Sequence, residues 1–205
     1  MASIDKIVAR IARRCRRSAP SGSNFEAEII DELLAAHGLL HESPILPWFL
    51  KASTQVVVAA NTDNFDVTSD IGSDNFIRMQ DDEPLSYTDP TGNSTELIPV
   101  VPQSERKILL QRYPGTGDVP KEFILDGNLI VVRPIPNQEI TYTFRYYRKD
   151  PTIPAAGATT LWSRHFSNLL MNMAGKEIAW SLSNEAAFQR FNNDLNTAYQ
   201  QFRNA

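Results

Sequence analysis

The placement of proline constrains the fold of this chain more than any other feature of its sequence. The chain of 205 residues contains 13 prolines, and 12 of them lie between Pro44 and Pro154. Only Pro20 precedes this window, and no proline follows it. Because proline lacks a backbone N–H and breaks helix interiors, the two ends can form helices while the middle must consist of strands, turns and loops. The sequence therefore predicts an α+β protein, with a helical bundle from the N- and C-terminal helices and a small antiparallel β-domain in the middle.

The same boundaries divide the chain into two predicted domains. Residues 1–50 and 158–205 are expected to form one helical domain, and residues 51–157 a β-rich insertion with an antiparallel meander. The length suits one domain or slightly more, and it allows a sizeable core.

Apolar spacing predicts two helices before the insertion. The first, with Ser3 as its N-cap, carries an apolar stripe at helical spacing, made of Ile4, Ile7, Val8, Ile11 and Cys15. After a loop, Ser23 or Asn24 is expected to cap a second helix, and Gly38 is expected to end it as a C′ glycine. The apolar segment Pro44–Leu50 must be buried.

Six segments of the insertion carry strand signals: Gln55–Ala60, Phe65–Thr68, Asn75–Gln80, Glu122–Leu125, Asn128–Arg133 and Glu139–Arg148. We expect the first two to form a hairpin around Asn61–Asn64. The pair Asp126-Gly127 predicts a type I′ turn between the fourth and fifth, and the sixth completes the meander. A turn is expected at Asp89–Asn93, and a short helix over Glu105–Tyr113 with Ser104 as its cap.

The C-terminal part is expected to be helical to its end. Thr159 or Thr160 is the predicted N-cap, and Ser181–Asn184 is a predicted break between two helices. The polar face of the last helix is mostly amide rather than charged.

Charge is distributed unevenly along the chain. Residues 1–17 hold six basic side chains against Asp5 alone, a net charge of +5, so the remainder carries −9. The basic face of the first helix, with Lys6, Arg10, Arg13, Arg14 and Arg17, has three interpretations. The first interpretation is an ordinary solvated face. The second is a contact for phosphates or for an acidic protein surface, and the third is part of a sequence-reading helix-turn-helix. The loop Ser18–Ser23 is long for the last of these. Membrane binding is disfavoured because the apolar face has no Trp or Phe.

Catalytic and metal-binding patterns are missing from the sequence. One cysteine (Cys15) and three histidines far apart in sequence (His37, His41 and His165) leave little for a metal site or a proton relay. The segment Gly115–Lys121 lacks the Gly-Lys-Ser/Thr ending of a phosphate loop. The spacing of Asp63, Asp66, Asp70 and Asp74 does not match a calcium loop. We therefore expect a non-enzymatic protein without cofactors.

The sequence also lacks the apolar stretches that a membrane span or a signal peptide requires. The chain is accordingly expected to be soluble and intracellular.

The order of three short motifs resembles a known family. They are Arg112–Lys121 (RYPGTGDVPK), Gly127–Pro136 (GNLIVVRPIP) and Tyr146–Pro151 (YYRKDP). Together with the N-terminal helix, the segment Leu46–Leu50 and the C-terminal helix pair, this series resembles the head-to-tail adaptor (head completion or connector) proteins of tailed bacteriophages. The resemblance covers about residues 4–200. One departure is the acidic insertion around Ser69–Thr95, where we expect a loop or an extra hairpin.

The resemblance implies a virion structural protein rather than an enzyme. Such adaptors form a homo-oligomeric ring, typically a dodecamer, that docks under the portal, extends the DNA channel and connects to the tail or nozzle protein. The implied localisation is the virion neck at the head–tail junction, after assembly in the host cytoplasm. Genomic DNA would pass through the lumen without sequence reading, and no membrane or cofactor is involved.

Two sets of residues are candidate contacts in such an assembly. Lys6, Arg10, Arg13, Arg14 and Arg17 are candidates for contact with DNA or with an acidic surface of a neighbouring copy or of the portal. Residues of the last helix are candidates for the portal or subunit interface: Phe188, Phe191, Leu195, Tyr199 and Phe202. The alternative function is a DNA-binding module that uses the basic N-terminal helix.

Overall fold

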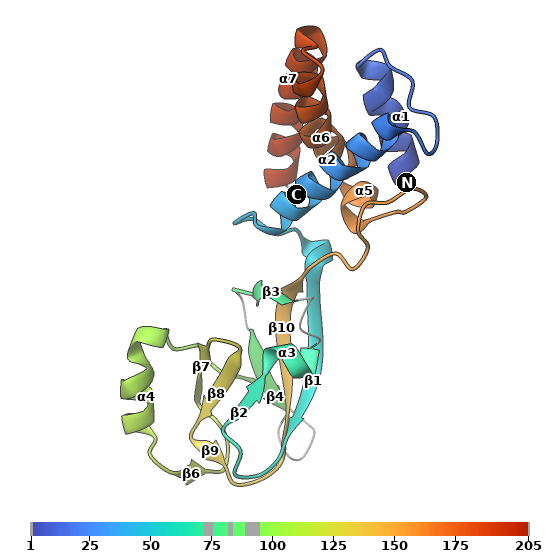
Figure 1. Ribbon diagram of the computed structural model, residues 1–205. Helices are drawn as coiled ribbons and strands as arrows, with labels where there is room; N and C mark the ends of the chain where they lie inside the picture. The colour runs from blue at the N-terminus through green and yellow to red at the C-terminus, as the bar shows by residue number, and fades with distance from the viewer. Residues whose placement is uncertain (1, 72–75, 82–83, 89–94, 205) are drawn as a thin grey trace. The chain divides into compact units, whose positions relative to one another are not determined.

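A computed structural model of the chain describes residues 2–71, 76–81, 84–88 and 95–204 (Figure 1). The chain divides into two compact units, residues 1–49 with 150–205 and residues 50–149. The first unit is helical and the second is built mainly of antiparallel strands, so the predicted α+β class is confirmed. Residues 150–157, assigned to the insertion by the sequence, belong to the helical unit, because Asp150 bonds to a helix there.

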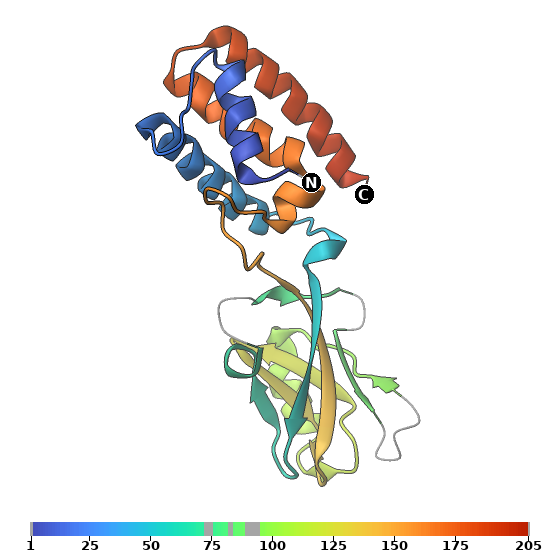
Figure 2. The same ribbon diagram turned by 90° about the vertical axis from the view of Figure 1, so that its right-hand side faces the viewer.

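The helical unit is built around one central helix. Its elements are α1 (Ile4–Arg14), α2 (Asn24–His41), α5 (Leu161–His165), α6 (Ser167–Ser181) and α7 (Glu185–Arg203), and the short helix η1 (Trp48–Leu50) begins in this unit. Helix α6 contacts the four other α-helices (Figures 1 and 2). The largest side chains of its core are fully buried: Ile4, Ile7, Ile11, Ile29, Leu33, Leu40, Trp162 and Phe191.

Helix α6 approaches α7 closely because one position has no side chain. A Cβ atom added to Gly175 would lie 2.5–2.8 Å from three ring atoms of Phe191. Phe191 is fully buried, so its ring has little room to move away. Glycine at this position therefore sets the distance between the two helices.

The helix ends match the sequence analysis in part. Thr160 forms a capping box with Ser163, and the Ser23 Oγ accepts a hydrogen bond from the backbone N–H of Glu26, whereas the side chain of Ser3 caps nothing. The expected end of the second helix at Gly38 is wrong: α2 continues to His41. Burial explains this result, because one further turn places Leu40 in the core, and a single exposed glycine costs a helix only about 1 kcal/mol.

Helices α1 and α6 end in the same way. Arg16 and Ser183 follow them with left-handed φ angles of 56° and 51°, and the next N–H in each case bonds to a carbonyl five residues back, as in a Schellman motif. The side-chain amide of Asn184 donates a hydrogen bond to the backbone carbonyl of Cys15 at 3.2 Å, and this bond joins the ends of the two helices. The predicted break at Ser181–Asn184 is confirmed.

The apolar segment Pro44–Leu50 is only partly buried. Leu46, Phe49 and Leu50 are buried, but Ile45 is 41% and Trp48 is 60% exposed. The expectation that the whole segment is buried is therefore wrong.

The described residues of the second unit form three small sheets. The first has the strand order β1-β10-β4-β5 with β3 also on β10, the second has the order β2-β8-β7, and the third pairs β6 with β9 in parallel. The strands are β1 (Lys51–Val58), β2 (Asn64–Asp66), β3 (Phe76–Met79), β4 (Leu85–Thr88), β5 (Thr95–Leu97), β6 (Thr116–Gly117), β7 (Glu122–Asp126), β8 (Leu129–Arg133), β9 (Ile135–Pro136) and β10 (Ile140–Arg148). The helical elements are α3 (Val67–Ile71), η2 (Gln103–Glu105) and α4 (Arg106–Arg112).

The sequence located the strands better than it located their partners. Strand β1 pairs with β10 and β2 pairs with β8, so the hairpin expected around Asn61–Asn64 does not form. Strand β10 pairs with β1, β3 and β4 rather than with β7 or β8, so the expected meander is also wrong. Alternation along β10 reports that one face is buried; it carries no information on which strand lies beside it.

The hairpin β7–β8 is confirmed, with its turn displaced by one residue. Asp126 pairs with Leu129, which leaves Gly127 and Asn128 as the turn. Only Gly127 has a positive φ, 63°, and glycine at the first position with an ordinary second residue fits a type II′ turn rather than type I′. The extra hairpin expected in the acidic insertion corresponds to the antiparallel pair β4–β5, while the turn expected at Asp89–Asn93 falls on residues 89–94, outside the described part.

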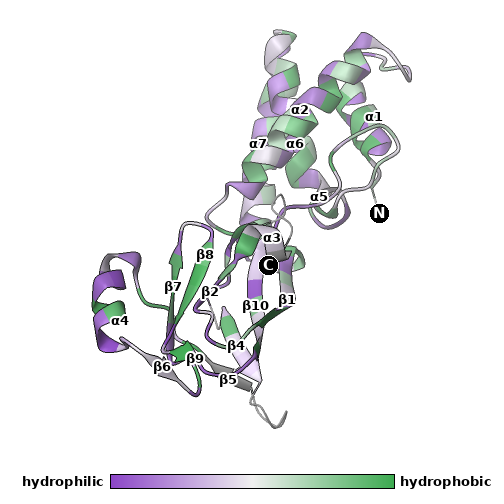
Figure 3. Cartoon of the chain, turned by 60° about the horizontal axis from the view of Figure 1, so that its bottom comes forward, coloured by the Kyte–Doolittle hydropathy of each residue, from purple (hydrophilic) through white to green (hydrophobic). Residues whose placement is uncertain are grey.

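Helix α4 is attached to this hairpin through charges. Arg106 pairs with Asp126 at 2.8 Å, and Arg112 pairs with Glu122 at 2.7 Å. Figure 3 shows α4 as largely hydrophilic and β8 as largely hydrophobic. The helix expected over Glu105–Tyr113 is confirmed, with η2 forming its first turn, but the predicted cap is wrong because Ser104 lies inside η2.

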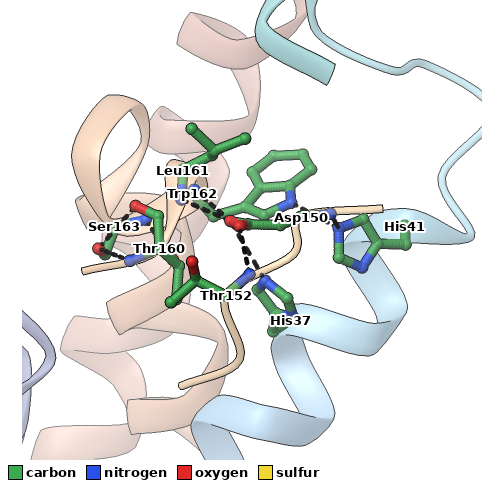
Figure 4. A network of polar contacts seen from close by, with 8 residues as sticks. All are labelled: His37, His41, Asp150, Thr152, Thr160, Leu161, Trp162 and Ser163. Atoms are coloured by element: carbon green, nitrogen blue, oxygen red, sulfur yellow. Dashed lines mark hydrogen bonds and ion pairs between the residues drawn. The ribbon is translucent and has the colours of Figure 1, made fainter. Parts of the chain in front are cut away.

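A buried carboxylate joins the two chain segments of the helical unit (Figure 4). The side chain of Asp150 is fully buried. Its Oδ1 accepts the backbone N–H of Thr152 at 3.0 Å, and its Oδ2 accepts those of Leu161 and Trp162 at the start of α5. His37 of α2 also contacts this carboxylate, because its Nε2 lies 3.5 Å from the Oδ2 of Asp150.

His41 binds the same junction from the end of α2. Its Nε2 accepts the backbone N–H of Asp150 at 3.0 Å and the indole N–H of Trp162 at 3.2 Å (Figure 4). Because Nε2 accepts both bonds, it carries no proton. The rings of His37 and His41 meet edge to face, with centroids 4.5 Å apart.

Burial by itself would raise the pKa of Asp150. The contact with His37 and the N–H groups of Thr152 and Leu161 outweigh burial, so the pKa of this carboxyl is lowered. A carboxylate with a lowered pKa stabilises the fold above the ordinary aspartate value of about 4, and that stabilisation is lost as the pH falls through the folded-state pKa.

We predict that Gly175→Ala destabilises the protein although alanine favours helices. The added Cβ must displace the ring of Phe191, and the free energy of unfolding should fall by about 1–3 kcal/mol. The matched control is Gly38→Ala in α2, where a Cβ meets nothing within 4 Å, and there stability should rise by about 0.5–1 kcal/mol. Urea denaturation measures both, and equal gains at the two positions would contradict the close approach of α6 and α7.

We predict that Asp150→Asn lowers the free energy of unfolding by about 2 kcal/mol at neutral pH, because charge-assisted bonds are lost. The gap to wild type should stay constant from about pH 7 to about pH 5 and should narrow below about pH 4, since the lowered pKa of Asp150 keeps the carboxylate ionised in the folded chain until the pH falls below the ordinary aspartate value. Urea titrations at several pH values measure this gap. Asp31→Asn, an exposed position on α2, is the control, and a gap for Asp150→Asn that does not change with pH would refute the role of the charge.

Candidate functional site

The basic residues of the first helix do not act as one group. Arg14 faces inward: its guanidinium donates to Asp194 at 2.8 Å and to Asn172 at 3.3 Å, and it lies over the ring of Phe191 at 5.2 Å. Arg14 therefore connects α1 to α6 and α7 and belongs to the fold.

The other basic side chains of α1 form an exposed stripe. Lys6, Arg10 and Arg13 are exposed and follow the spacing i, i+4, i+7, which places them on one side of a helix. Within the described residues, no ion pair joins any of the three to an acidic group. Beyond the helix end, Arg17 is also exposed and lies over the ring of Phe25 at 5.5 Å. We call Lys6, Arg10 and Arg13 the basic stripe.

The candidate interface residues of α7 separate into two groups. Phe191, Leu195 and Phe202 are buried within the helical unit, so in the folded chain they pack against its own helices. Phe188 is half-buried beside Trp180, with ring centroids 5.6 Å apart, and Tyr199 is 38% exposed. Only Phe188 and Tyr199 of this set present an aromatic surface to a partner.

A groove runs between α2 and α7 over the surface of α6. One part has a volume of about 520 Å³ and includes Leu39, Ile45 and Tyr199 in its lining. An adjoining part of about 250 Å³ shares Leu39, Met173 and Tyr199 with the first. We call the two parts together the α2/α7 groove. A separate pocket of about 340 Å³ lies at the α6–α7 turn, beside Trp180 and Phe188.

Two acidic side chains line the smaller part of this groove. Glu32 of α2 and Glu177 of α6 both border it. Burial raises the pKa of Glu32, and the nearby negative charges of Glu177 and Asp31 raise it further. The lining of the groove therefore combines apolar walls with three acidic side chains, Glu32, Glu42 and Glu177, against two basic ones, Lys176 and Arg203.

No group of three or more His, Cys, Asp or Glu side chains in the described part of the chain could hold a metal ion. Burial raises the pKa of the Cys15 thiol, although the charge of Arg17 opposes this, so the thiol is a buried apolar group. His165 is exposed and stacks on Phe49 with ring centroids 4.7 Å apart.

The acidic stretch considered for calcium has other contacts. Asp63 pairs with Arg133 at 2.7 Å, and Asp66 accepts two hydrogen bonds from Thr68, which lower its pKa. Asp74 and the side chain of Asp70 lie outside the described part.

The three motifs that carry the family resemblance hold the fold together. Strand β6 of the first motif pairs with β9 of the second, and a Cβ at Gly117 would lie 2.7 Å from the Pro134 ring. The third motif supplies the buried rings of Tyr146 and Tyr147 and the carboxylate of Asp150. The residues of these motifs named here therefore have structural roles, in strand pairing, side-chain packing and helix capping, rather than catalytic ones.

Sequence reasoning did not identify the His37–His41–Asp150 junction or the exposed Trp180, which is 67% exposed. The only sequence signal for the junction was the i, i+4 spacing of the two histidines on one helix. Nothing in the sequence connected that pair to Asp150, because the contact spans more than a hundred residues.

Comparison with known proteins identifies the family. Among the described residues, no helix has both the length and the apolarity needed to cross a bilayer. None of the curated proteins matches the chain. A family model described as "SU10 adaptor protein" matches residues 2–205. The match spans nearly the whole chain, as does the order of motifs, and the chain therefore belongs to the SU10 adaptor protein family, a family of phage head-to-tail adaptors.

Proposed function

We propose that this protein is a non-enzymatic structural component of the virion neck. It assembles as a ring under the portal, extends the DNA channel and connects the head to the tail or nozzle protein. The observation that carries this proposal is the family match over residues 2–205. A dodecamer is the expected copy number, and genomic DNA passes through the lumen without sequence reading.

The surfaces of the helical unit support an assembly role. Trp180 and Trp48 are 67% and 60% exposed, and Leu39 is 59% exposed. Exposed aromatic and aliphatic side chains beside apolar grooves are typical of interaction sites. We assign the portal or subunit interface of α7 to Phe188 and Tyr199, the two candidates of that helix that reach the surface.

Binding to the portal tests this function directly. The protein is mixed with purified portal rings of the phage that encodes it, and complexes are examined by native mass spectrometry and negative-stain microscopy. We expect several copies on each portal ring, forming an added ring of density. An unrelated protein of similar mass and charge is the control, and a chain that stays monomeric without portal affinity would contradict the proposal.

A second candidate function is DNA binding through the basic stripe. The observation in its favour is that Lys6, Arg10 and Arg13 are exposed on one helix face and have no ion-pair partner in the part of the chain described. Contacts to phosphates would make the affinity fall steeply with salt.

We predict only weak, sequence-independent DNA affinity for the wild type. Binding to short duplexes should decrease by about tenfold or more between about 50 mM and about 200 mM salt. Arg10→Glu/Arg13→Glu should abolish it, while Lys107→Glu/Lys121→Glu, with the same charge change on exposed residues of the other unit, should retain most of it. Fluorescence anisotropy measures both, and sequence-selective affinity lost in the first variant would favour a DNA-binding module over the adaptor.

A further inference from the structure

We propose that the α2/α7 groove of one copy receives the basic stripe of α1 from a second copy of this chain, so that neighbouring copies join head to tail. This inference rests on the proposed ring assembly and names the contact that would build it.

The groove has the character of a surface that is covered in an assembly. Leu39 and Tyr199 lie in both of its parts and are 59% and 38% exposed, and Ile45 at one end is 41% exposed. Helix α2 is unusual in having apolar side chains on both faces: Leu33 and Leu40 enter the core while Leu39 faces outward. A second apolar face on a helix indicates a second packing partner.

Charge selects the partner. Glu28 and Asp31 are exposed on α2, and Glu32 and Glu177 border the groove. Within the described residues, only Glu177 of these four forms an ion pair, with Lys176 at 3.1 Å, and Arg203 is the other cation in the groove lining. Burial raises the pKa of Glu32, and the nearby charges of Glu177 and Asp31 raise it further, so a cation placed beside these carboxylates would be favourable.

The basic stripe has the matching chemistry and spacing. From Lys6 to Arg13 it extends about 10 Å along α1 at 1.5 Å per residue, longer than the roughly 6 Å from Glu28 to Glu32 on α2, so part of the stripe reaches beyond these acidic side chains. Lysine and arginine side chains lay their methylene stems on apolar surface while their charged ends reach carboxylates. One row of such side chains can therefore cover Leu39 and Tyr199 and also neutralise the acidic side chains.

A basic stripe that lies in the groove must come from another copy, because α1 cannot reach the groove of its own chain. Ile4, Ile7 and Ile11 fix α1 in the core at 0% exposure, and no residue of α1 lines either part of the groove. The stripe and the groove are thus two different patches of one unit. A contact between two different patches is heterologous, and repetition of such a contact generates a ring when the rotation closes.

Charge reversal tests the contact in the full-length protein. Self-association is measured by sedimentation velocity at increasing protein concentration in low salt. We expect Arg10→Glu/Arg13→Glu to weaken association about 30-fold or more, because like charges then face each other. Asp31→Arg/Glu32→Arg should do the same. The chain carrying all four reversals restores opposite charges across the contact and should regain association to within a few-fold of wild type.

Controls separate this outcome from other effects. Lys107→Glu/Lys121→Glu has the same charge change as the first variant and should associate like wild type. Circular dichroism should be unchanged in every variant, and thermal unfolding should change little, since Arg10, Arg13 and Asp31 are exposed and Glu32 is half-buried at the edge of the groove. Wild-type protein that remains monomeric at all concentrations, or four reversals that fail to restore association, would overturn the inference. In either case portal binding by wild type would still support the adaptor function, so the two proposals can fail separately.

Discussion

The helical unit depends on the buried carboxylate of Asp150, because this unit is assembled from two segments separated by the whole of the β-rich unit. The chain leaves the bundle after α2 and returns at Asp150. At that point the carboxylate caps the first turn of α5, and His41 accepts the N–H of Asp150 and the indole N–H of Trp162. A buried charge is stable only when its hydrogen bonds are satisfied, and the N–H donors to this carboxylate, those of Thr152, Leu161 and Trp162, come from the second segment. The first segment adds His37, at 3.5 Å from Oδ2, and His41, which accepts the backbone N–H of Asp150, so the surroundings of Asp150 join the two segments of the bundle.

This closure determines which surfaces remain for other molecules. With Trp162, Phe191 and Phe202 in the core, the outer sides of α1, α2 and α7 stay exposed. Arg14 is used internally, whereas Lys6, Arg10 and Arg13 point outward without a partner in the described chain. The uneven charge of the sequence therefore becomes two separate patches on one unit, a basic stripe and a partly acidic groove. The proposed ring would need two such surfaces, since each copy of a ring contacts a neighbour on either side.

The sequence predicted the class of fold well, because proline and apolar spacing report local geometry directly. It located β10, the β7–β8 hairpin, the Thr160 cap and the break before α7. It failed where the outcome depended on distant partners. Burial of Leu40 carried α2 past Gly38, and the core placed β10 beside β1 instead of beside β8.

For the candidate site, the sequence identified the basic residues of the first helix. It could not separate Arg14, which pairs with Asp194 inside the helical unit, from the exposed ones, because only the fold shows that contact. Likewise, helical spacing could not distinguish the buried Phe191 and Phe202 from the exposed Tyr199.

The central claim is that this member of the SU10 adaptor protein family works as a ring subunit joined through its helical unit. A cryo-EM reconstruction of the protein bound to its portal tests the claim most directly. The account predicts a closed ring below the portal in which the basic stripe of each copy lies in the α2/α7 groove of the next. A portal without bound ring, or a ring whose α1 stripes face solvent with the groove empty, would contradict it.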